Sequence, residues 1–464
     1  MTARNLLYSF IIISIVAVFS ITGGGCAQIG APTGGPKDTI PPVLVSASPS
    51  LHSINVKGNK ITLTFNEYIE LKDVTNNVLV SPVPNKTPSV DYKLKTVTVK
   101  LKDTLLPNTT YSIDFGNAIA DINEGNPYRH FTYVFSTGKF IDSLTLSGKV
   151  ILAETGKTDS TIIAMLYRNA NDSSVRKRKP DYIARLDSGG NYTFKNLPSG
   201  NFNLYALRDG DFGKTYNSKS EMFAFADKPV LIDGDNEAPE LFAFQEEKEN
   251  KNQPGAPIRV AAEKKVRYAT SLAGGTQGLL NDINITFNKP LKTFDAGGFQ
   301  LTDTNYTRIN TANIQLDSSR KIVTIKNKWP EDFNYRLIIA KEAVQDSANN
   351  FLAKSDTIKF HTKSQSDYGT LALRFTGLDL ARHPVLQFVQ NGEVKFSYPI
   401  TAKEWNNKLF EPGDYELRIL YDENNNGKWD TGNYSKKLQP EKVISLPQKL
   451  GVKGNWDNER DIVL

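Results

Sequence analysis

Short stretches in which apolar and polar residues alternate recur from residue 43 to the end of the chain, and they constrain the fold more than any other feature. Examples are "KITLTF", "TVTVKL" and "FTYVFST", which are rich in β-branched and aromatic residues and are separated by clusters of Gly, Asn, Pro and Asp. Successive strand residues point to opposite faces of a sheet, so this alternation predicts half-buried strands. Short strands spaced about 8 to 12 residues apart are typical of β-sandwiches and barrels. No long amphipathic helical pattern follows residue 26, and the sequence therefore predicts an all-β protein.

Two pairs of segments repeat along the chain. "NKITLTFNEYIEL" at 59–71 is similar to "NDINITFNKPLKT" at 281–293, and the stretch at 109–137 is similar to that at 333–362. In both copies of the second pair, a strand leads to an Asp- and Asn-containing turn and then to a closing strand that ends in Thr. Turn chemistry of this kind suits a hairpin or short connection between sandwich strands.

The segments between these repeats are also similar to each other. "LPSGNFNLYALRDGDFGKTYN" at 197–217 corresponds to "FEPGDYELRILYDENNNGKWD" at 410–430. A fixed internal period indicates tandem units, and the order is therefore A–B–A′–B′. The predicted organisation is a lipoprotein signal peptide (1–25), a lipidated Cys and flexible tether (26–40), module A (41–138), module B (139–248), a hinge and module A′ (249–363), and module B′ (364–464).

The N-terminus predicts export and lipidation. Arg4 precedes an apolar run from Leu6 to Ile21, small residues follow, and this order is typical of a secretory signal peptide. Cys26 directly follows Gly24 and Gly25, in a segment that resembles a bacterial lipobox. That resemblance implies that the signal is cut before Cys26 and that acyl chains on this residue hold the protein to a membrane. An uncleaved N-terminal anchor is the alternative.

Cys26 is the only cysteine in the chain. After acylation no thiol remains, which excludes disulfides, Cys-rich metal sites and Cys nucleophiles. The formal net charge of +6 is spread over 464 residues, and so mild an excess argues against a dedicated nucleic-acid-binding protein.

The modules resemble two known families. Module A carries Pro41–Pro42, the strand Ile61–Asn66, Asp121 and a closing Phe135, as does the SbsA-type bacterial Ig-like domain. Module A′ follows this pattern more loosely. Module B carries "GNYTFKNLPSGNFNL" at 190–204, which resembles transthyretin-like or carboxypeptidase-regulatory-like β-sandwiches, and B′ keeps part of that pattern.

This combination, together with "CAQIGAPTGGPKD" from Cys26 onward, resembles Ig-like lipoproteins of Bacteroidetes-type bacteria. The resemblance implies a lipid-anchored protein of the outer membrane. Whether it lies on the periplasmic face or on the cell surface stays open.

The sequence contains no constellation that predicts catalysis. Its four histidines, His52, His130, His361 and His383, are scattered, and neither HExxH nor G-x-S-x-G occurs. We therefore expect no enzymatic activity and no required cofactor.

One loop is a candidate Ca²⁺ site. In "DENNNGKWDTGN", the residues Asp422, Asn424, Asn426 and Asp430 stand at positions 1, 3, 5 and 9 of a calcium loop, and the carbonyl of Lys428 stands at position 7. Position 12 is Asn instead of the usual bidentate Glu, so weak binding with a structural role is the expectation. The alternative is a polar turn that satisfies its own hydrogen bonds.

Three functions are compatible with these features. The first is a membrane-anchored, non-enzymatic scaffold or binding protein of the cell envelope. The second is a carbohydrate- or protein-binding accessory lipoprotein, in which Trp329, Trp405, Trp429 and Trp456 would offer stacking surfaces. The third is a hydrolase with an interdomain site. The expected partners are the membrane, through Cys26, and an envelope protein or a glycan.

Overall fold

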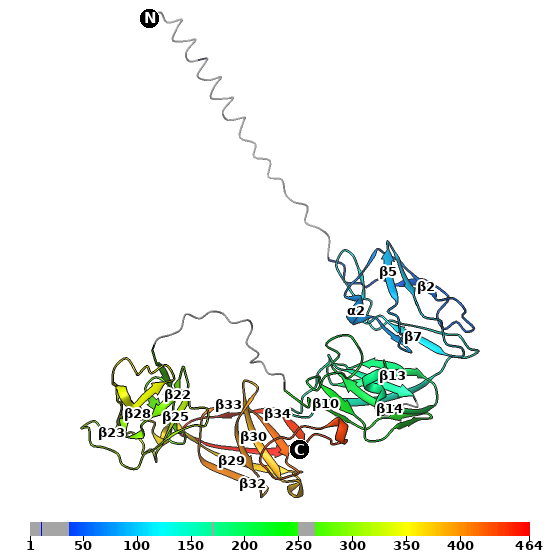
Figure 1. Cartoon of the computed structure of the whole chain (residues 1–464). Helices are drawn as coiled ribbons and strands as arrows, with labels where there is room; N and C mark the ends of the chain where they lie inside the picture. The colour runs from blue at the N-terminus through cyan, green and yellow to red at the C-terminus, as the bar shows by residue number, and fades with distance from the viewer. Residues whose placement is uncertain (1–10, 12–36, 169–170, 249–264) are drawn as a thin grey trace, which may run out of the picture. The chain divides into compact units, whose positions relative to one another are not determined.

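The computed structural model describes residue 11 and residues 37–168, 171–248 and 265–464 (Figure 1). Strands dominate these residues, and each helix from α2 (Val74–Asn77) onward spans only three or four residues. The predicted all-β class is therefore confirmed. Cys26 and most of the predicted signal peptide lie outside the described residues. Within the described part of the chain, no helix is long and apolar enough to cross a membrane.

The chain forms two compact units. The first comprises the described part of Met1–Val80 together with Lys86–Phe140, and the second comprises Ser81–Asn85 together with Ile141–Leu464.

Module A is built from two main sheets and a small strand pair. The sheet orders are β1-β2-β6-β5 and β4-β7-β9, and β3 pairs with β8. In β2, Ile61, Leu63 and Phe65 are buried in the core whereas Thr62 and Thr64 are half-buried, as the alternation predicts. Its elements are β1 (Leu44–Ser48), β2 (Lys60–Phe65), β3 (Ile69–Leu71), α2 (Val74–Asn77), β4 (Leu79–Ser81), β5 (Ser89–Lys93), β6 (Thr96–Lys100), β7 (Thr110–Asp114), β8 (Ile119–Asp121) and β9 (Thr132–Ser136).

Module A′ repeats this topology. Its sheets have the orders β19-β21-β25-β24 and β20-β28-β26-β23, and β22 pairs with β27. The strand β21 buries Ile283, Ile285 and Phe287, the counterparts of the three core residues of β2. Its elements are β19 (Tyr268–Thr270), β20 (Thr276–Gln277), β21 (Ile283–Phe287), β22 (Leu291–Phe294), η1 (Ala296–Gly298), β23 (Phe299–Thr302), β24 (Asn313–Leu316), β25 (Ile322–Lys326), β26 (Asn334–Ile339), η2 (Lys341–Ala343), β27 (Val344–Asp346) and β28 (Asp356–Thr362).

The Asp-containing turns of A and A′ also have the same construction. The carboxylate of Asp121 accepts hydrogen bonds from the backbone N–H groups of Gly125 and Asn126, and that of Asp346 accepts them from Ala348 and Asn350. Both carboxylates are almost completely buried. Each closes its turn by replacing water with backbone donors.

Module B has a different topology. Its sheets have the orders β13-β10-β17 and β12-β11-β14-β15, with β16 on β14 and with β18 parallel to β10. Its elements are β10 (Leu144–Leu152), β11 (Ile163–Arg168), α3 (Ser174–Lys177), β12 (Tyr182–Arg185), β13 (Asn191–Leu197), β14 (Gly200–Leu207), β15 (Phe223–Phe225), β16 (Val230–Ile232), β17 (Asp235–Glu237) and β18 (Leu241–Ala243).

Module B′ repeats the topology of B. The sheets β32-β29-β35 and β31-β30-β33-β34 correspond to β13-β10-β17 and β12-β11-β14-β15, and β35 lies parallel to β29 as β17 does to β10. Its elements are η3 (Gln365–Asp367), β29 (Gly369–Thr376), η4 (Leu380–Arg382), β30 (Pro384–Gln390), β31 (Glu393–Pro399), β32 (Glu404–Phe410), β33 (Gly413–Tyr421), η5 (Tyr434–Lys436), β34 (Lys442–Val452) and β35 (Asp457–Val463).

Two glycines mark the repeat of B in B′. Gly200 opens β14 with φ 148°, and Gly413 opens β33 with φ 154°. This backbone region favours glycine because a Cβ would be strained there, which explains why "PSG" and "EPG" recur at the same place. The tandem β-sandwich organisation is confirmed, and each topology occurs twice. Each repeat has its own cluster of buried apolar residues.

Candidate functional site

The predicted Ca²⁺ loop connects the two longest strands of module B′. It begins at Asp422, directly after β33, and leads into η5, after which the chain enters β34. β33 and β34 pair with each other along most of their length (Figure 1). The loop therefore stands at one end of a sheet that fixes both of its ends.

Asp422 organises the first half of this loop. Its side chain is fully buried, and its carboxylate accepts hydrogen bonds from the backbone N–H groups of Asn426 at 3.1 Å and Gly427 at 2.5 Å. The Lys428 N–H donates to the Asn426 side-chain oxygen at 2.8 Å. These contacts curl the chain back on itself, as the polar-turn alternative also predicts.

Asp430 organises the second half. Its Oδ2 accepts hydrogen bonds from the side-chain amides of Asn424 at 2.5 Å and Asn426 at 2.6 Å. Glu441, just before β34, accepts the backbone N–H groups of Glu423 and Asp430, both at 2.9 Å. Burial raises the pKa of Glu441, and the nearby carboxylates of Asp422 and Asp430 raise it further.

The structure thus brings together all five residues of the predicted site and adds Glu441. In this arrangement the amide nitrogens of Asn424 and Asn426 face Asp430. Rotation of each amide by half a turn would present its oxygen, the atom that Ca²⁺ prefers. Within the described residues, no group of three or more His, Cys, Asp or Glu side chains is arranged to hold a metal ion. Calcium binding stays a prediction.

The equivalent loop of module B is closed by its own contacts. The Asp209 carboxylate accepts the Lys214 backbone N–H at 3.0 Å, and Asp211 accepts the Asn217 side-chain amide at 2.7 Å. Burial raises the pKa of Asp209, and the neighbouring Asp211 carboxylate contributes in the same direction. The loop leads to Tyr216, whose ring stacks on Phe223 with 4.1 Å between the centroids.

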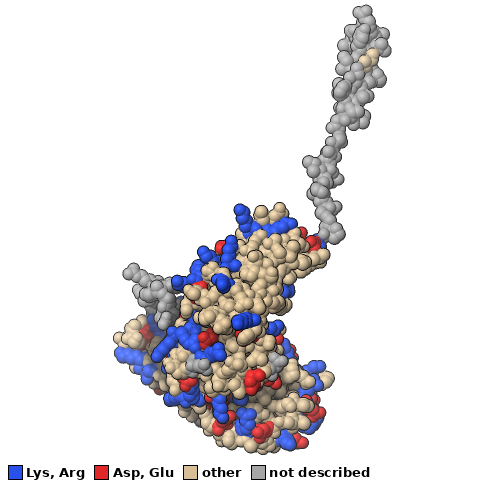
Figure 2. Space-filling view, turned by 90° about the vertical axis from the view of Figure 1, so that its right-hand side faces the viewer, with Lys and Arg blue, Asp and Glu red and all other residues tan. Residues whose placement is uncertain are grey.

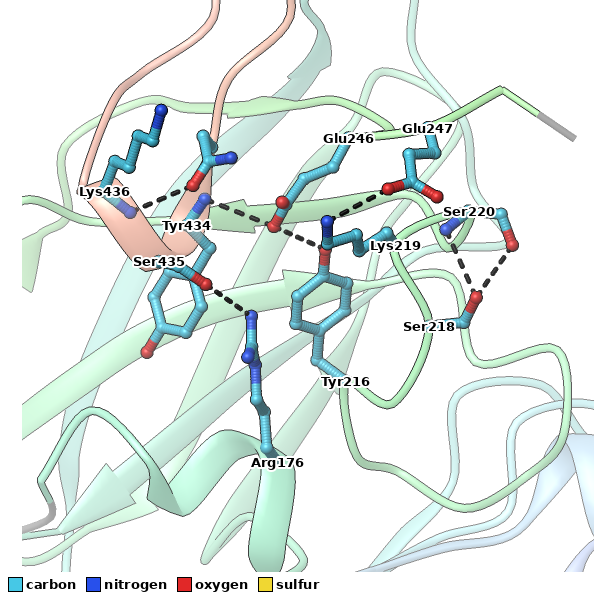
Figure 3. A network of polar contacts seen from close by, with 11 residues as sticks. Arg176, Tyr216, Ser218, Lys219, Ser220, Glu246, Glu247, Tyr434, Ser435 and Lys436 are labelled. Atoms are coloured by element: carbon cyan, nitrogen blue, oxygen red, sulfur yellow. Dashed lines mark hydrogen bonds and ion pairs between the residues drawn. The ribbon is translucent and has the colours of Figure 1, made fainter.

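The two equivalent loops meet at Tyr434, the first residue of η5. Its side chain is only 4% exposed, and its ring packs edge-on against four aromatic residues of module B. Figure 3 shows Tyr434 beside Tyr216 and Glu246. The ring partners, with centroid distances, are Tyr205 at 5.9 Å, Tyr216 at 6.2 Å, Phe223 at 5.1 Å and Phe225 at 5.2 Å.

Tyr434 is also held by hydrogen bonds. Its hydroxyl donates to the backbone carbonyl of Asp172 at 2.7 Å and lies 3.2 Å from the Tyr205 hydroxyl. Its backbone N–H donates to Glu246 Oε1 at 3.3 Å, and the same oxygen accepts the Tyr216 hydroxyl at 2.8 Å. A buried ring whose polar end is fully partnered is typical of an interface anchor.

Further contacts between B and B′ surround this anchor. They include both hydrogen bonds and charged pairs: Thr431 Oγ1 to the Gln245 carbonyl (2.6 Å), Arg176 to Ser435 Oγ (3.2 Å), Lys437 to Asp172 (2.8 Å), Gln439 to the Phe225 carbonyl (3.0 Å), Val443 N–H to the Ala153 carbonyl (3.1 Å) and Lys157 to Glu416 (2.8 Å). Modules B and B′ therefore contact each other through hydrogen bonds, ion pairs and a shared aromatic cluster.

The sequence did not reveal Tyr434, Glu441 or their partners. "NYSKK" follows the candidate loop without any periodic pattern, and nothing in one sequence links Tyr434 to Tyr205, which lies 229 positions earlier. The only available signal was an aromatic residue directly after a polar loop, which is too common to use.

The remaining candidates are dispersed. All four histidines are exposed. Trp329 is buried in the core of A′ and donates its ring N–H to the Asn281 carbonyl, whereas Trp405 packs on the core of B′. Trp456 is 61% exposed, and Trp429 is half-buried in the candidate loop. On the face that Figure 2 shows, Lys and Arg lie in several separate groups, with Asp and Glu between some of them.

Comparison with known protein families finds a match for one part of the chain. Residues 38–137 match the bacterial Ig-like domain, and this range corresponds to module A. A search of curated proteins gave no match.

Several solved structures are similar over larger parts of the chain. The N-terminal part of the bacterial S-layer protein SbsC is 17% identical, with 44% of this chain and 44% of that chain covered and a TM-score of 0.16. The L,D-transpeptidase from Mycobacterium smegmatis is 12% identical, with 28% and 63% covered and a TM-score of 0.16. BcpA, the major pilin subunit of Bacillus cereus, is 10% identical, with 69% and 98% covered and a TM-score of 0.16. This chain thus spans less than two thirds of the first two, and scores this low carry no conclusion about function.

Proposed function

We propose that this chain is a membrane-anchored lipoprotein of the cell envelope, and that its tandem β-sandwich modules form a non-enzymatic scaffold or binding protein. The bacterial Ig-like match over residues 38–137 supports a role in which modules space or present surfaces. Acylation of Cys26 would supply the anchor, because two or three acyl chains, at about 0.8 kcal/mol per buried CH₂, hold a protein to a bilayer far more firmly than one.

The observation that carries this proposal is the direct contact between B and B′. Tyr434 fills an aromatic cluster of module B although module A′ separates the two modules in the sequence. A chain that folds back to join its second and fourth modules gains a defined geometry between them. Defined geometry is what a scaffold needs in order to present surfaces.

The distribution of perturbed carboxylates also favours a non-catalytic role. A hydrolase site would gather several carboxyl groups with shifted pKa values in one cleft. Among the described residues, the carboxyl groups with a raised pKa are Glu67, Asp209 and Glu441, and each belongs to a different module.

Protease accessibility on intact cells tests the proposal, with the Cys26→Ala variant as the control. The expected result is a membrane-bound protein whose variant is lost from the membrane fraction. Digestion on whole cells would place the modules on the cell surface, and protection until the outer membrane is opened would place them in the periplasm. A Cys26→Ala protein that stays membrane-bound would contradict the lipid anchor.

A further inference from the structure

A cavity of about 780 Å³ lies where module B meets the outer face of the large sheet of B′. One wall is the loop from Gly427 to Thr431, and another is formed by residues of B near Glu154 and Glu246. The volume lies in the range of small-molecule sites, about 300 to 1,000 Å³. Both its position and its lining are independent of the membrane anchor.

Arg418 on β33 is the first unusual feature of this cavity. Its side chain points away from the core of B′, because its neighbours Leu417 and Ile419 belong to that core. Arg418 is only 3% exposed, yet its ion pair with Glu416 is long at 3.8 Å. Among the described residues, its Nε has no hydrogen-bond partner. A buried guanidinium, which has five N–H donors, is costly to leave in this state.

Glu246, in the same lining, has an acceptor oxygen that lacks a hydrogen-bond donor. Its Oε1 accepts the hydrogen bonds from Tyr216 and Tyr434, but its Oε2 is buried and has no partner in the described part of the chain. The lining therefore contains one donor and one acceptor that have no partner in the described part of the chain, and both atoms lie beneath the surface of the lining, so a ligand would reach them only after the two side chains turn toward the cavity. A ligand that fits must supply both an acceptor and a donor.

The charges of the lining favour a neutral ligand over a strongly charged one. Four carboxylates and three cationic side chains line the cavity: Glu154, Glu246, Glu393 and Asp430, with Lys248, Arg418 and Lys428. An anion would meet the carboxylates, and a cation would meet Arg418 and the two lysines. A neutral ligand with many hydroxyl groups meets both, since each hydroxyl both donates and accepts.

Trp429 adds the apolar part of the site. It lines the cavity, while its ring N–H is already used by the Glu441 carbonyl at 2.8 Å and its ring packs on Val385, Leu420 and Val443. These contacts fix the indole. A fixed aromatic ring beside unpaired polar groups offers a sugar both a stacking surface and hydrogen bonds.

We infer that this cavity binds a neutral saccharide, with Arg418 donating to it, Glu246 accepting from it and Trp429 packing against its ring. The inference goes beyond the proposed function, because it holds whichever face of the outer membrane carries the protein. Because each sugar hydroxyl both donates and accepts, one saccharide can satisfy both side chains once they turn toward it.

The test uses the full chain, purified in a detergent without sugar head groups. Binding of cellobiose, lactose, mannobiose and N,N′-diacetylchitobiose is measured by saturation-transfer NMR and calorimetry. At least one of these sugars is expected to bind, and Arg418→Met, Glu246→Gln and Trp429→Ala should each weaken binding about tenfold or more, the change that one lost hydrogen bond or stacking contact produces. Trp456→Ala is the matched control, since Trp456 is exposed on the same module and does not line the cavity.

The melting temperature of each variant shows whether it is folded. If Arg418→Met does not fold, Glu246→Gln, which keeps the size and shape of the side chain, provides the same test. The inference would be overturned if none of the four sugars binds at about 10 mM, ten times a millimolar dissociation constant. It would also be overturned if glucuronic acid, which is charged, were the one sugar that binds. Binding that only Trp456→Ala weakens would overturn it as well. Membrane fractionation of Cys26→Ala is not affected by any of these results, so failure here is distinguishable from failure of the proposed function.

Discussion

Replacing Tyr434 tests whether modules B and B′ unfold together. The ring is 4% exposed and contacts four aromatic residues of module B. Loss of a buried aromatic side chain to Ala costs about 3 to 5 kcal/mol, and aromatic pairs contribute about 0.5 to 1.5 kcal/mol each beyond the area that they bury. Tyr434→Ala should therefore destabilise the B–B′ pair by about 3 to 5 kcal/mol.

The Phe variant separates the ring from the hydroxyl. Tyr434→Phe keeps the aromatic contacts but leaves the Asp172 carbonyl, otherwise 2.7 Å from the hydroxyl, without this donor. Asp172 is exposed, so water can replace the lost donor, and the loss of this hydrogen bond should cost only about 0.5 to 1.5 kcal/mol. The expected order of stability is wild type, then Phe, then Ala.

Urea unfolding and calorimetry measure both effects. In the wild-type protein B and B′ should unfold in one transition, and in Tyr434→Ala this transition should split, because each module keeps its own core. Tyr92→Ala is the control, since Tyr92 is 48% exposed on β5 of module A and surface substitutions usually change stability by less than about 0.5 kcal/mol. An unchanged urea midpoint in Tyr434→Ala would refute the contact between the modules, and equal losses in Phe and Ala would show that the ring contributes little.

Two further predictions concern carboxylates. If the loop at Asp422 binds Ca²⁺ with a dissociation constant of about 0.1 to 1 mM, 10 mM Ca²⁺ should stabilise B′ by about 1.4 to 2.7 kcal/mol. Asp430→Asn should abolish this stabilisation. An equal stabilisation by Mg²⁺ would contradict the assignment of a calcium loop. Hydrogen bonds from Asn350 and the ion pair with Lys289 lower the pKa of Asp346 to about 2. Because the unfolded carboxyl titrates near pH 4, its contribution to stability is complete above about pH 4 and is lost as the pH falls towards 2. Asp346→Asn should be less stable at pH 7 and should show a shallower loss of stability between pH 4 and 2, and an unchanged acid profile would contradict this account.

The strand organisation was predictable because the positions of the strands depend on local sequence patterns. The alternation in "KITLTF" and "INITF" assigns Ile61 and Ile283 to cores, and both are almost completely buried. The repeat of "PSG" and "EPG" predicted equivalent strands, and β14 and β33 occupy equivalent places in their sheets. Local alternation cannot give the parallel pairing of β29 with β35, since parallel partners are joined by long connections.

The candidate site was predictable only in part, for the same reason. The spacing of oxygen-bearing residues from Asp422 to Asp430 is a property of one loop, and the structure does bring these residues together. Glu441 joins them from the position just before β34, 11 positions after Asp430. From the sequence alone, Arg418 cannot be distinguished from any other outward-facing residue of a half-buried strand. Its burial results from module B, which covers that face of the sheet, and no pattern within module B′ encodes that cover.

The two copies of the B topology have diverged where they meet. After β14 the loop of B returns quickly to Tyr216, whose ring stacks on Phe223, whereas after β33 the loop of B′ is longer and continues into η5. Because the loop of B′ is longer, Tyr434 reaches the ring of Tyr216. The two equivalent loops therefore contribute to one aromatic cluster. This divergence explains how two similar modules associate without competing for the same surface, since one supplies the inserted ring and the other the receiving pocket. It also explains why the cavity at Arg418 exists, because the loop that carries Tyr434 is the loop that forms the cavity wall.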